Sequence, residues 1–146
     1  MYKHILVPTD GSKLSLKALK AAGELAGRLK ARVTAIYVMV PFMPSTESDA
    51  VAFYPSYSAR DYEKEVRKVA DAALARAKSA AGEVKFEGVA EFGASPWEAI
   101  VKAAKGRKCD LIVMASHGRR GLAGLLLGSE TQKVLIHSKI PVLVCR

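Results

Sequence analysis

Hydrophobic and polar positions alternate along the chain with two different periods. Apolar runs of strand length occupy residues 2–7, 32–40, 84–92, 111–114 and 140–145. The longer segments between these runs carry apolar residues at every third or fourth position, which places those residues on one face of a helix. Strands that alternate with helices predict a parallel sheet, because a parallel strand pair needs a crossover connection. The pattern therefore predicts the order β-α-β-α-β-α-β-α-β.

The predicted sheet is open, parallel and five-stranded, with helices on both faces, as in Rossmann-like and flavodoxin-like α/β folds. Half of the 146 residues are hydrophobic, and a chain of this length can bury roughly 70% of its unfolded surface. No internal repeat or linker divides the sequence. We therefore expect one domain that spans residues 1–146.

The first two helices have recognisable start and stop signals. Ser12 or Asp10 precedes the first helical pattern and is expected to cap that helix. A long helix is expected from residue 58 to 81, with Gly82 at its end. The residues expected on its buried face are Tyr62, Val66, Val69, Ala73 and Ala77.

The last two helices are shorter. Ser95 followed by Pro96 predicts a helix start, because proline fits the first helical position, and this helix is expected to end near Gly106. Ser129 and Gln132 have the spacing of a capping box, so Ser129 is expected to cap the last helix.

Two segments depart from these regular patterns. Residues 41–57 hold three prolines and four aromatic residues without any periodicity. A loop of this length is often a lid or an interaction segment, and we expect this one to pack or to contact a partner. The strand at 84–92 changes its alternation at Gly88, which predicts either a bulge or an outer strand.

Charge and cysteine content narrow the classes of partner. The net charge is +9, but the basic residues alternate with acids along helix faces, and no aromatic residues interleave with them as in RNA-binding sheets. We therefore expect no specific nucleic-acid partner.

No apolar run approaches the ~20 residues of a membrane span, no signal segment precedes the first strand, and Cys109 and Cys145 lack a CxxC spacing. We expect a cytoplasmic protein with reduced thiols and no membrane partner.

The segment 110–135 carries the strongest functional signal. An apolar run that ends at Met114 leads into ten residues, 116–125, with three glycines and two arginines. Gly128 and Ser129 then open a helix. Glycine lets the main chain approach a ligand closely, and a helix N-terminus with a free hydroxyl attracts anions. Together with the two arginines, this pattern indicates a phosphate-binding loop.

The predicted topology brings this loop close to two distant segments. In an open parallel sheet, ligands bind outside the carboxyl ends of the strands. The turn Pro8-Thr9-Asp10 and the strand position Val38 lie at the same edge as the loop. Asp10 can accept a hydrogen bond from a ribose hydroxyl or from adenine, and Val38 offers an apolar wall for a base. These residues together predict a nucleotide site.

The same residues carry a resemblance to a known family. The nucleotide-binding universal stress proteins have Gly-x2-Gly-x9-Gly-Ser/Thr after the fourth strand. This chain has Ala115, Gly118, nine intervening residues and then Gly128-Ser129, so the spacing matches in full and Ala115 replaces one glycine. With the opening HILVPTDGS and the closing IPVLVC, the chain resembles this family over its whole length. The resemblance implies the adenine nucleotide alpha hydrolase-like variant of the predicted fold.

The resemblance also implies a ligand and its contacts. It implies ATP, with Mg²⁺ accompanying the phosphates. It places Pro8, Asp10 and Val38 at the adenine and ribose. It places Ala115, Gly118, Gly128, Ser129 and Thr131 at the phosphates. Their sequence neighbours Thr9, Met114, Arg119 and Glu130 complete the expected set of binding residues.

Two positions at the start of the loop are expected to have particular backbone conformations. Gly118 is expected to adopt a positive φ and to approach a phosphate closely, which a branched side chain would prevent. Ala115 is expected to be compatible with ATP binding if its φ is negative, as in a residue that continues a strand.

The expected function is that of an ATP-binding regulatory module in a stress response, which acts as a homodimer through the edge strand at 140–145. Two alternatives stay open: a dimeric interaction protein of the same fold that binds no nucleotide, and a slow ATPase. Catalysis is not expected, because the chain lacks both the G-x-S-x-G elbow and the lysine of a Walker motif. His4, His117 and His137 lack metal-ligand spacing. We therefore assign no catalytic or metal-binding residue.

Overall fold

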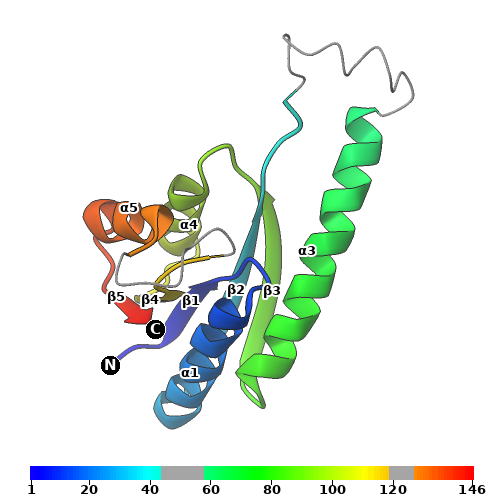
Figure 1. The fold of residues 1–146 in the computed structure, drawn as a ribbon. Helices are drawn as coiled ribbons and strands as arrows, with labels where there is room; N and C mark the ends of the chain where they lie inside the picture. Colours follow the sequence, from blue (N-terminus) through cyan, green and yellow to red (C-terminus); the bar gives the residue numbers. More distant parts are fainter. Residues whose placement is uncertain (44–57, 119–126) are drawn as a thin grey trace.

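The computed structural model describes residues 1–43, 58–118 and 127–146, and these residues form five strands and four helices in the predicted order (Figure 1). The elements are β1 (His4–Pro8), α1 (Lys13–Leu29), β2 (Arg32–Met39), α3 (Ala59–Ala81), β3 (Lys85–Phe92), α4 (Pro96–Gly106), β4 (Leu111–Ala115), α5 (Ser129–His137) and β5 (Val142–Cys145). Most of the irregular segment 41–57, and Arg119 in the loop, lie outside the described residues.

All strand pairs are parallel, and the order across the sheet is β3-β2-β1-β4-β5. The chain winds outward from β1 through β2 to β3, and then crosses back to β4 beside β1. The winding direction therefore reverses between β1 and β4, which is where open α/β sheets bind ligands.

Helices cover both faces of this sheet, as predicted. One core joins α1 and α3 to the sheet through residues such as Leu19, Ala77 and Val113. The other core joins α4 and α5 to the opposite face through Ile100, Val134 and similar residues. Figure 1 shows the two helix pairs on either side of the strands.

The outer strand β3 pairs with β2 over its full length. The register runs without interruption from Arg32 opposite Lys85 to Met39 opposite Phe92. Gly88 therefore marks an edge strand, which confirms one of the two expectations, and the described pairing contains no bulge. Gly88 lies against the Leu74 side chain of α3, where an added Cβ would be 3.4 Å from the Leu74 Cβ.

The buried face of α3 differs from the prediction at one position. Val69 is 46% exposed, and Ala70 is fully buried in its place. Ala70 continues a stripe of small residues with Ala73 and Ala77. Because alanine has a small side chain, this stripe lets the helix lie close to the sheet and to α1. Burial of Val69 would rotate the larger side chain into that narrow space.

The starts of the last two helices differ in part from the prediction. Ser129 is the first residue of α5 and not its cap, since Gly128 occupies the cap position and makes no side-chain hydrogen bond there. Gln132 instead donates its side-chain amide to the Leu127 carbonyl at 2.7 Å. Ser95 holds the cap position of α4, but its side chain makes no capping hydrogen bond.

Candidate functional site

The turn after β1 is held by its own side chains. The Thr9 main-chain N–H donates to the Ile36 carbonyl of β2 at 2.9 Å, which ties the end of β1 to the neighbouring strand. The Thr9 hydroxyl lies 3.0 Å from the Ser15 hydroxyl and accepts from the Gly11 N–H at 3.2 Å. Gly11 has φ of 77°, a conformation that glycine adopts without strain. Thr9 therefore shapes the turn.

Asp10 and Ser12 divide two roles between them. Ser12 caps α1, because its hydroxyl accepts from the Ser15 N–H at 3.2 Å. One carboxylate oxygen of Asp10 accepts from the Ser12 N–H at 2.9 Å, which fixes the orientation of the carboxylate. The other oxygen, Oδ2, faces Gly118 in the segment that follows β4. Of the two expected caps, Ser12 is therefore the one observed.

Gly118, three residues after β4, lies against this carboxylate. A Cβ built on Gly118 would lie 2.6 Å from Asp10 Oδ2, which is closer than any real Cβ contact. The φ of Gly118 is not positive, so the expectation of a left-handed backbone there is wrong. Any larger residue at this position would force the Asp10 carboxylate to move, because the Gly118 main chain passes directly beside it.

Ala115 keeps the conformation of a strand residue. It pairs with Cys145 of β5, and its φ is not positive. The methyl group that replaces the family glycine therefore adds no conformational strain. The Ala115 carbonyl accepts from the Thr131 hydroxyl at 2.9 Å, so this buried hydroxyl joins the end of β4 to α5.

The two described ends of the loop after β4 meet each other. The Gly128 N–H donates to the Ser116 carbonyl at 2.7 Å, and a Cβ on Gly128 would lie 3.0 Å from the Cα of His117. The Ser116 hydroxyl and His117 Nδ1 are 3.2 Å apart. Ser116 lies in the predicted loop but was not among the predicted binding residues, because its contribution is a main-chain carbonyl and every residue has one.

The N-terminus of α5 presents donors at this same edge. The main-chain N–H groups of Ser129, Glu130 and Thr131 make no hydrogen bond to any described residue. Such N–H groups, at the positive end of the helix dipole, bind anions. Among the described residues these three donors have no acceptor, and they lie at the same edge as the contact of Gly118 with Asp10.

Glu130 turns away from this edge toward a neighbouring helix. Its carboxylate accepts from the Trp97 N–H at 2.8 Å, in the first turn of α4, and it pairs with Lys133 at 3.0 Å. The Trp97 ring stacks on His137 with a centroid distance of 4.4 Å. Glu130 therefore joins α5 to α4.

The remaining predicted side chains contribute mainly to the core. Met114 is buried, and Val38 packs half-buried against the same core on the face of α4 and α5. Pro8 is the last residue of β1 and pairs with Ile36. These residues lie at the expected edge, with Val38 one strand farther from the loop than Asp10.

Burial disfavours a thiol nucleophile at both cysteines of the chain. Burial raises the pKa of Cys145, which pairs with Ala115, and burial raises the pKa of Cys109 to about 11. Both cysteines are free thiols and stay protonated at neutral pH.

Within the described ranges, no group of three or more His, Cys, Asp or Glu side chains could hold a metal ion. No described helix has the length and apolarity of a membrane span.

Comparison with known proteins identifies the family. The model of the universal stress protein family matches residues 1–146. A universal stress protein of Methanocaldococcus jannaschii is 35% identical over the whole of this chain and 83% of its own length. One from Bacillus subtilis is 34% identical over the full length of both.

Solved structures agree with these sequence relatives. A second M. jannaschii universal stress protein superposes with a TM-score of 0.79 at 30% identity, covering 99% of this chain and 96% of its own. A universal stress protein in complex with cAMP superposes with a TM-score of 0.66 at 30% identity, over 98% and 95% of the two chains. The chain therefore belongs to the universal stress protein family.

Proposed function

We propose that this protein binds an adenine nucleotide, ATP with Mg²⁺, at the carboxyl edge of β1 and β4, and acts as a regulatory module. The observation that carries the proposal is the approach of Gly118 to Asp10, where an added Cβ would lie 2.6 Å from Oδ2. That approach unites the carboxylate expected at the ribose with the loop expected at the phosphates. These segments are more than a hundred residues apart in the sequence.

The donors and acceptors of this edge fit a nucleotide. Asp10 supplies a carboxylate whose orientation is fixed by its own turn. The free N–H groups at the start of α5 suit phosphate oxygens, and Ser129 adds a hydroxyl. Mg²⁺ would arrive with the phosphates, since it is commonly bound by substrate phosphates together with water. The solved relative that binds cAMP has the same fold and an identity of 30%, which supports an adenine ligand.

Three residues that were expected to contact the nucleotide already make other hydrogen bonds, so we assign them different roles. Thr131 already donates its hydroxyl proton to Ala115, and Gly128 already donates its N–H to Ser116, so both shape the loop around the phosphates. Glu130 contributes its main-chain N–H and not its carboxylate, which is engaged by Trp97. Arg119 remains an expected phosphate contact from the sequence.

The test is a calorimetric titration with ATP at millimolar Mg²⁺. Gly118→Ala should weaken ATP binding by roughly ten-fold or more, because the methyl group displaces the Asp10 carboxylate and the loss of a charged hydrogen bond costs about 1.5–3 kcal/mol. Gly106→Ala is the matched control, since a Cβ at Gly106 meets nothing within 4 Å. Gly106→Ala should leave the affinity unchanged.

Two results would contradict the proposal. A folded wild-type protein that binds no ATP, cAMP or AMP would favour the interaction protein without a nucleotide. Equal ATP affinity in wild type and Gly118→Ala would place the nucleotide elsewhere. Release of phosphate from bound ATP would instead support the slow ATPase.

The homodimer belongs to the same proposal. β5 is the outer strand beside β4, and Leu143 at its centre is 45% exposed. An apolar edge strand is a template for pairing with another chain. We therefore propose that two copies pair through β5. A cytoplasmic location, as expected from the sequence, remains part of this proposal.

A further inference from the structure

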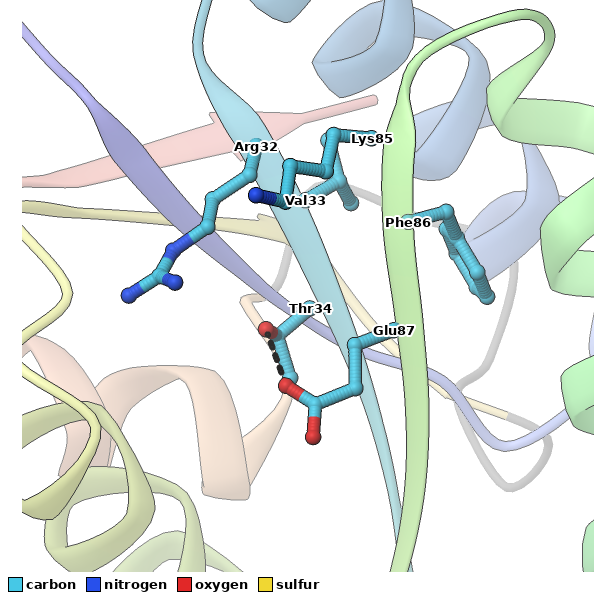
Figure 2. A pocket seen from close by; sticks show the side chains of 6 residues that line it. All are labelled: Arg32, Val33, Thr34, Lys85, Phe86 and Glu87. Atoms are coloured by element: carbon cyan, nitrogen blue, oxygen red, sulfur yellow. Dashed lines mark hydrogen bonds between the residues drawn. The ribbon is translucent and has the colours of Figure 1, made fainter.

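A groove lies at the amino ends of β2 and β3, at the other end of the strands from the candidate nucleotide site. It has a volume of about 200 Å³ and is lined by Arg32, Val33, Thr34, Lys85, Phe86 and Glu87 (Figure 2). Sites for drug-sized ligands measure roughly 300–1,000 Å³, so this groove is too small for a nucleotide. Since a water molecule takes up about 30 Å³ of liquid, the groove suits a hydrated ion or a small metabolite.

Two cations stand side by side in this groove. Arg32 and Lys85 are Cα partners in the parallel register of β2 and β3, and Figure 2 shows the Lys85 side chain extending from β3 toward Arg32. Like charges directly opposite each other on neighbouring strands repel. Neither side chain makes an ion pair or a hydrogen bond with any residue that the structure describes. No described carboxylate therefore forms an ion pair with either cation.

The two acids nearest the groove pair with another arginine. Arg107, at the end of α4, pairs with Glu87 at 3.1 Å and with Glu91 at 3.2 Å. Glu87 also accepts from the Thr34 hydroxyl at 3.4 Å. Both carboxylates therefore pair with Arg107, and neither of them forms an ion pair with Arg32 or Lys85.

We propose that this groove binds a small oxyanion of the phosphate type, held between Arg32 and Lys85. The planar guanidinium of arginine matches two oxygens of a phosphate at once, and lysine adds a compact positive charge. The anion removes the repulsion between the two cations, which a neutral ligand would not do. Free phosphate and the phosphoryl group of a small metabolite share this chemistry.

A buried histidine beside the groove reports its occupancy. His4 is 4% exposed, and its Nε2 lies 2.8 Å from the Thr34 hydroxyl oxygen. Burial lowers the pKa of His4, and the positive charge of Arg32 lowers it further, while the Arg107 carbonyl, Asp110 and Glu87 raise it. An anion next to Arg32 offsets the charge of that arginine. Phosphate binding should therefore raise the pKa of His4, and by linkage the anion should bind more tightly when His4 is protonated.

The experiment is an NMR titration of the full chain with inorganic phosphate. The expected result is a saturable shift of the amide signals of 32–34 and 85–87, with a rise in the pKa of the His4 ring. Arg32→Gln and Lys85→Gln should each weaken this binding by about ten-fold, as expected for loss of a charge-assisted contact. Lys20→Gln, on the exposed face of α1, makes the same change in net charge and should leave the affinity unchanged.

Several outcomes would overturn the proposal. Amide shifts that never saturate, or that weaken equally in Lys20→Gln and Lys85→Gln, would reflect the overall charge of +9. An unchanged pKa of His4 at saturating phosphate would place the ion away from Arg32. Binding at the start of α5 shifts the amides of 129–131 instead, so the two sites separate in one titration.

A parallel titration with glycerol phosphate identifies the source of the anion. Equal affinities for phosphate and glycerol phosphate indicate the free ion, and tighter binding of glycerol phosphate indicates a phosphorylated metabolite. No detectable binding of either probe at the groove would contradict the proposal.

Discussion

Single glycines decide how closely the helices of this protein approach one another. Gly23 of α1 faces the main chain of Ala81 at the end of α3, and a Cβ on Gly23 would overlap the Ala81 carbonyl oxygen. Gly27, one turn further along the same face, would place its Cβ 3.9 Å from Val84 Cγ1, which is an ordinary contact. The two glycines lie four residues apart on one helix, but only Gly23 has no room for a side chain.

We expect Gly23→Ala to lower the free energy of unfolding by about 1–3 kcal/mol, because overpacking forces α1 and α3 apart. Gly27→Ala should raise the free energy of unfolding by up to about 1 kcal/mol, since alanine favours the helix and nothing opposes its methyl group. Urea denaturation of the two variants measures both values. Equal effects of the two substitutions would contradict the close crossing at Gly23.

The buried His4 links stability to pH. The pKa of His4 in the folded protein lies below its ordinary value of 6.5, chiefly because of burial, so below 6.5 the unfolded chain binds a proton that the folded protein resists. The stabilisation is complete above pH 6.5 and is lost as the pH falls from 6.5 through the lower pKa of the folded state.

Urea denaturation between pH 7.5 and 5 should therefore show a fall in stability that His4→Gln removes. His137→Gln removes an exposed imidazole and should retain the fall. An identical pH dependence in wild type and His4→Gln would show that other groups cause it.

At the scale of elements, periodicity predicted every helix and strand but not every contact face. The α3 pattern is compatible with burial of either Val69 or Ala70, because both lie three or four residues from other apolar positions. The packing of α3 against the sheet decides for Ala70, and the residues on the other side of that contact are far away in the sequence. The acceptor at the start of α4 was not predicted for a similar reason, since the Glu130 carboxylate reaches the Trp97 N–H only when the helices are packed.

Glu130 makes the start of α4 depend on α5. Glu130→Ala should lower the free energy of unfolding by about 1 kcal/mol, because the Trp97 N–H loses its capping acceptor. Glu65→Ala removes an exposed carboxylate that pairs with Lys68 on α3 and should change stability by less than about 0.5 kcal/mol.

The emission of Trp97, the single tryptophan of the chain, provides a second readout at the α4–α5 contact. Glu130→Ala should alter this emission in the folded protein, and Glu65→Ala should leave it unchanged. If the emission and the stability of Glu130→Ala both match wild type, the carboxylate does not hold α4.

At the scale of the whole molecule, the sequence predicted the parallel sheet, the two helical layers and the edge at which β1 and β4 meet. Alternating patterns and the connection rules of parallel strands are sufficient for that result. The groove beside Arg32 was not predictable, because the two cations become neighbours only through the register of β2 and β3. The contact of Gly118 with Asp10 was predicted as a meeting of segments, but its reason is space and not a positive φ.

The proposed dimer has a clear solution test. Wild type should scatter light at tens of micromolar with a mass of about twice 15.7 kDa. Leu143→Lys should raise the dissociation constant of the dimer by about ten-fold or more, because burial of a leucine contributes about 1.5–3 kcal/mol and an edge lysine opposes strand pairing.

Val69→Lys is the matched control for Leu143→Lys, because Val69 is also half-exposed but lies on α3, across the sheet from β5 (Figure 1). Val69→Lys should remain dimeric. A monomeric wild type, or equal dissociation in both variants, would exclude pairing through β5.

The position of β1 at the centre of the sheet has a consequence for synthesis on the ribosome. The Asp110 carboxylate accepts from the main-chain N–H groups of Lys3 and His4, 107 and 106 residues earlier in the chain. At a translation rate of about 5–20 residues per second, the first strand is made roughly 5–20 s before this partner. During that interval β1 can pair with β2, but its other edge has no neighbour of its own. The nascent chain therefore carries an open apolar strand edge, the kind of surface that chaperones shield, until β4 has been made.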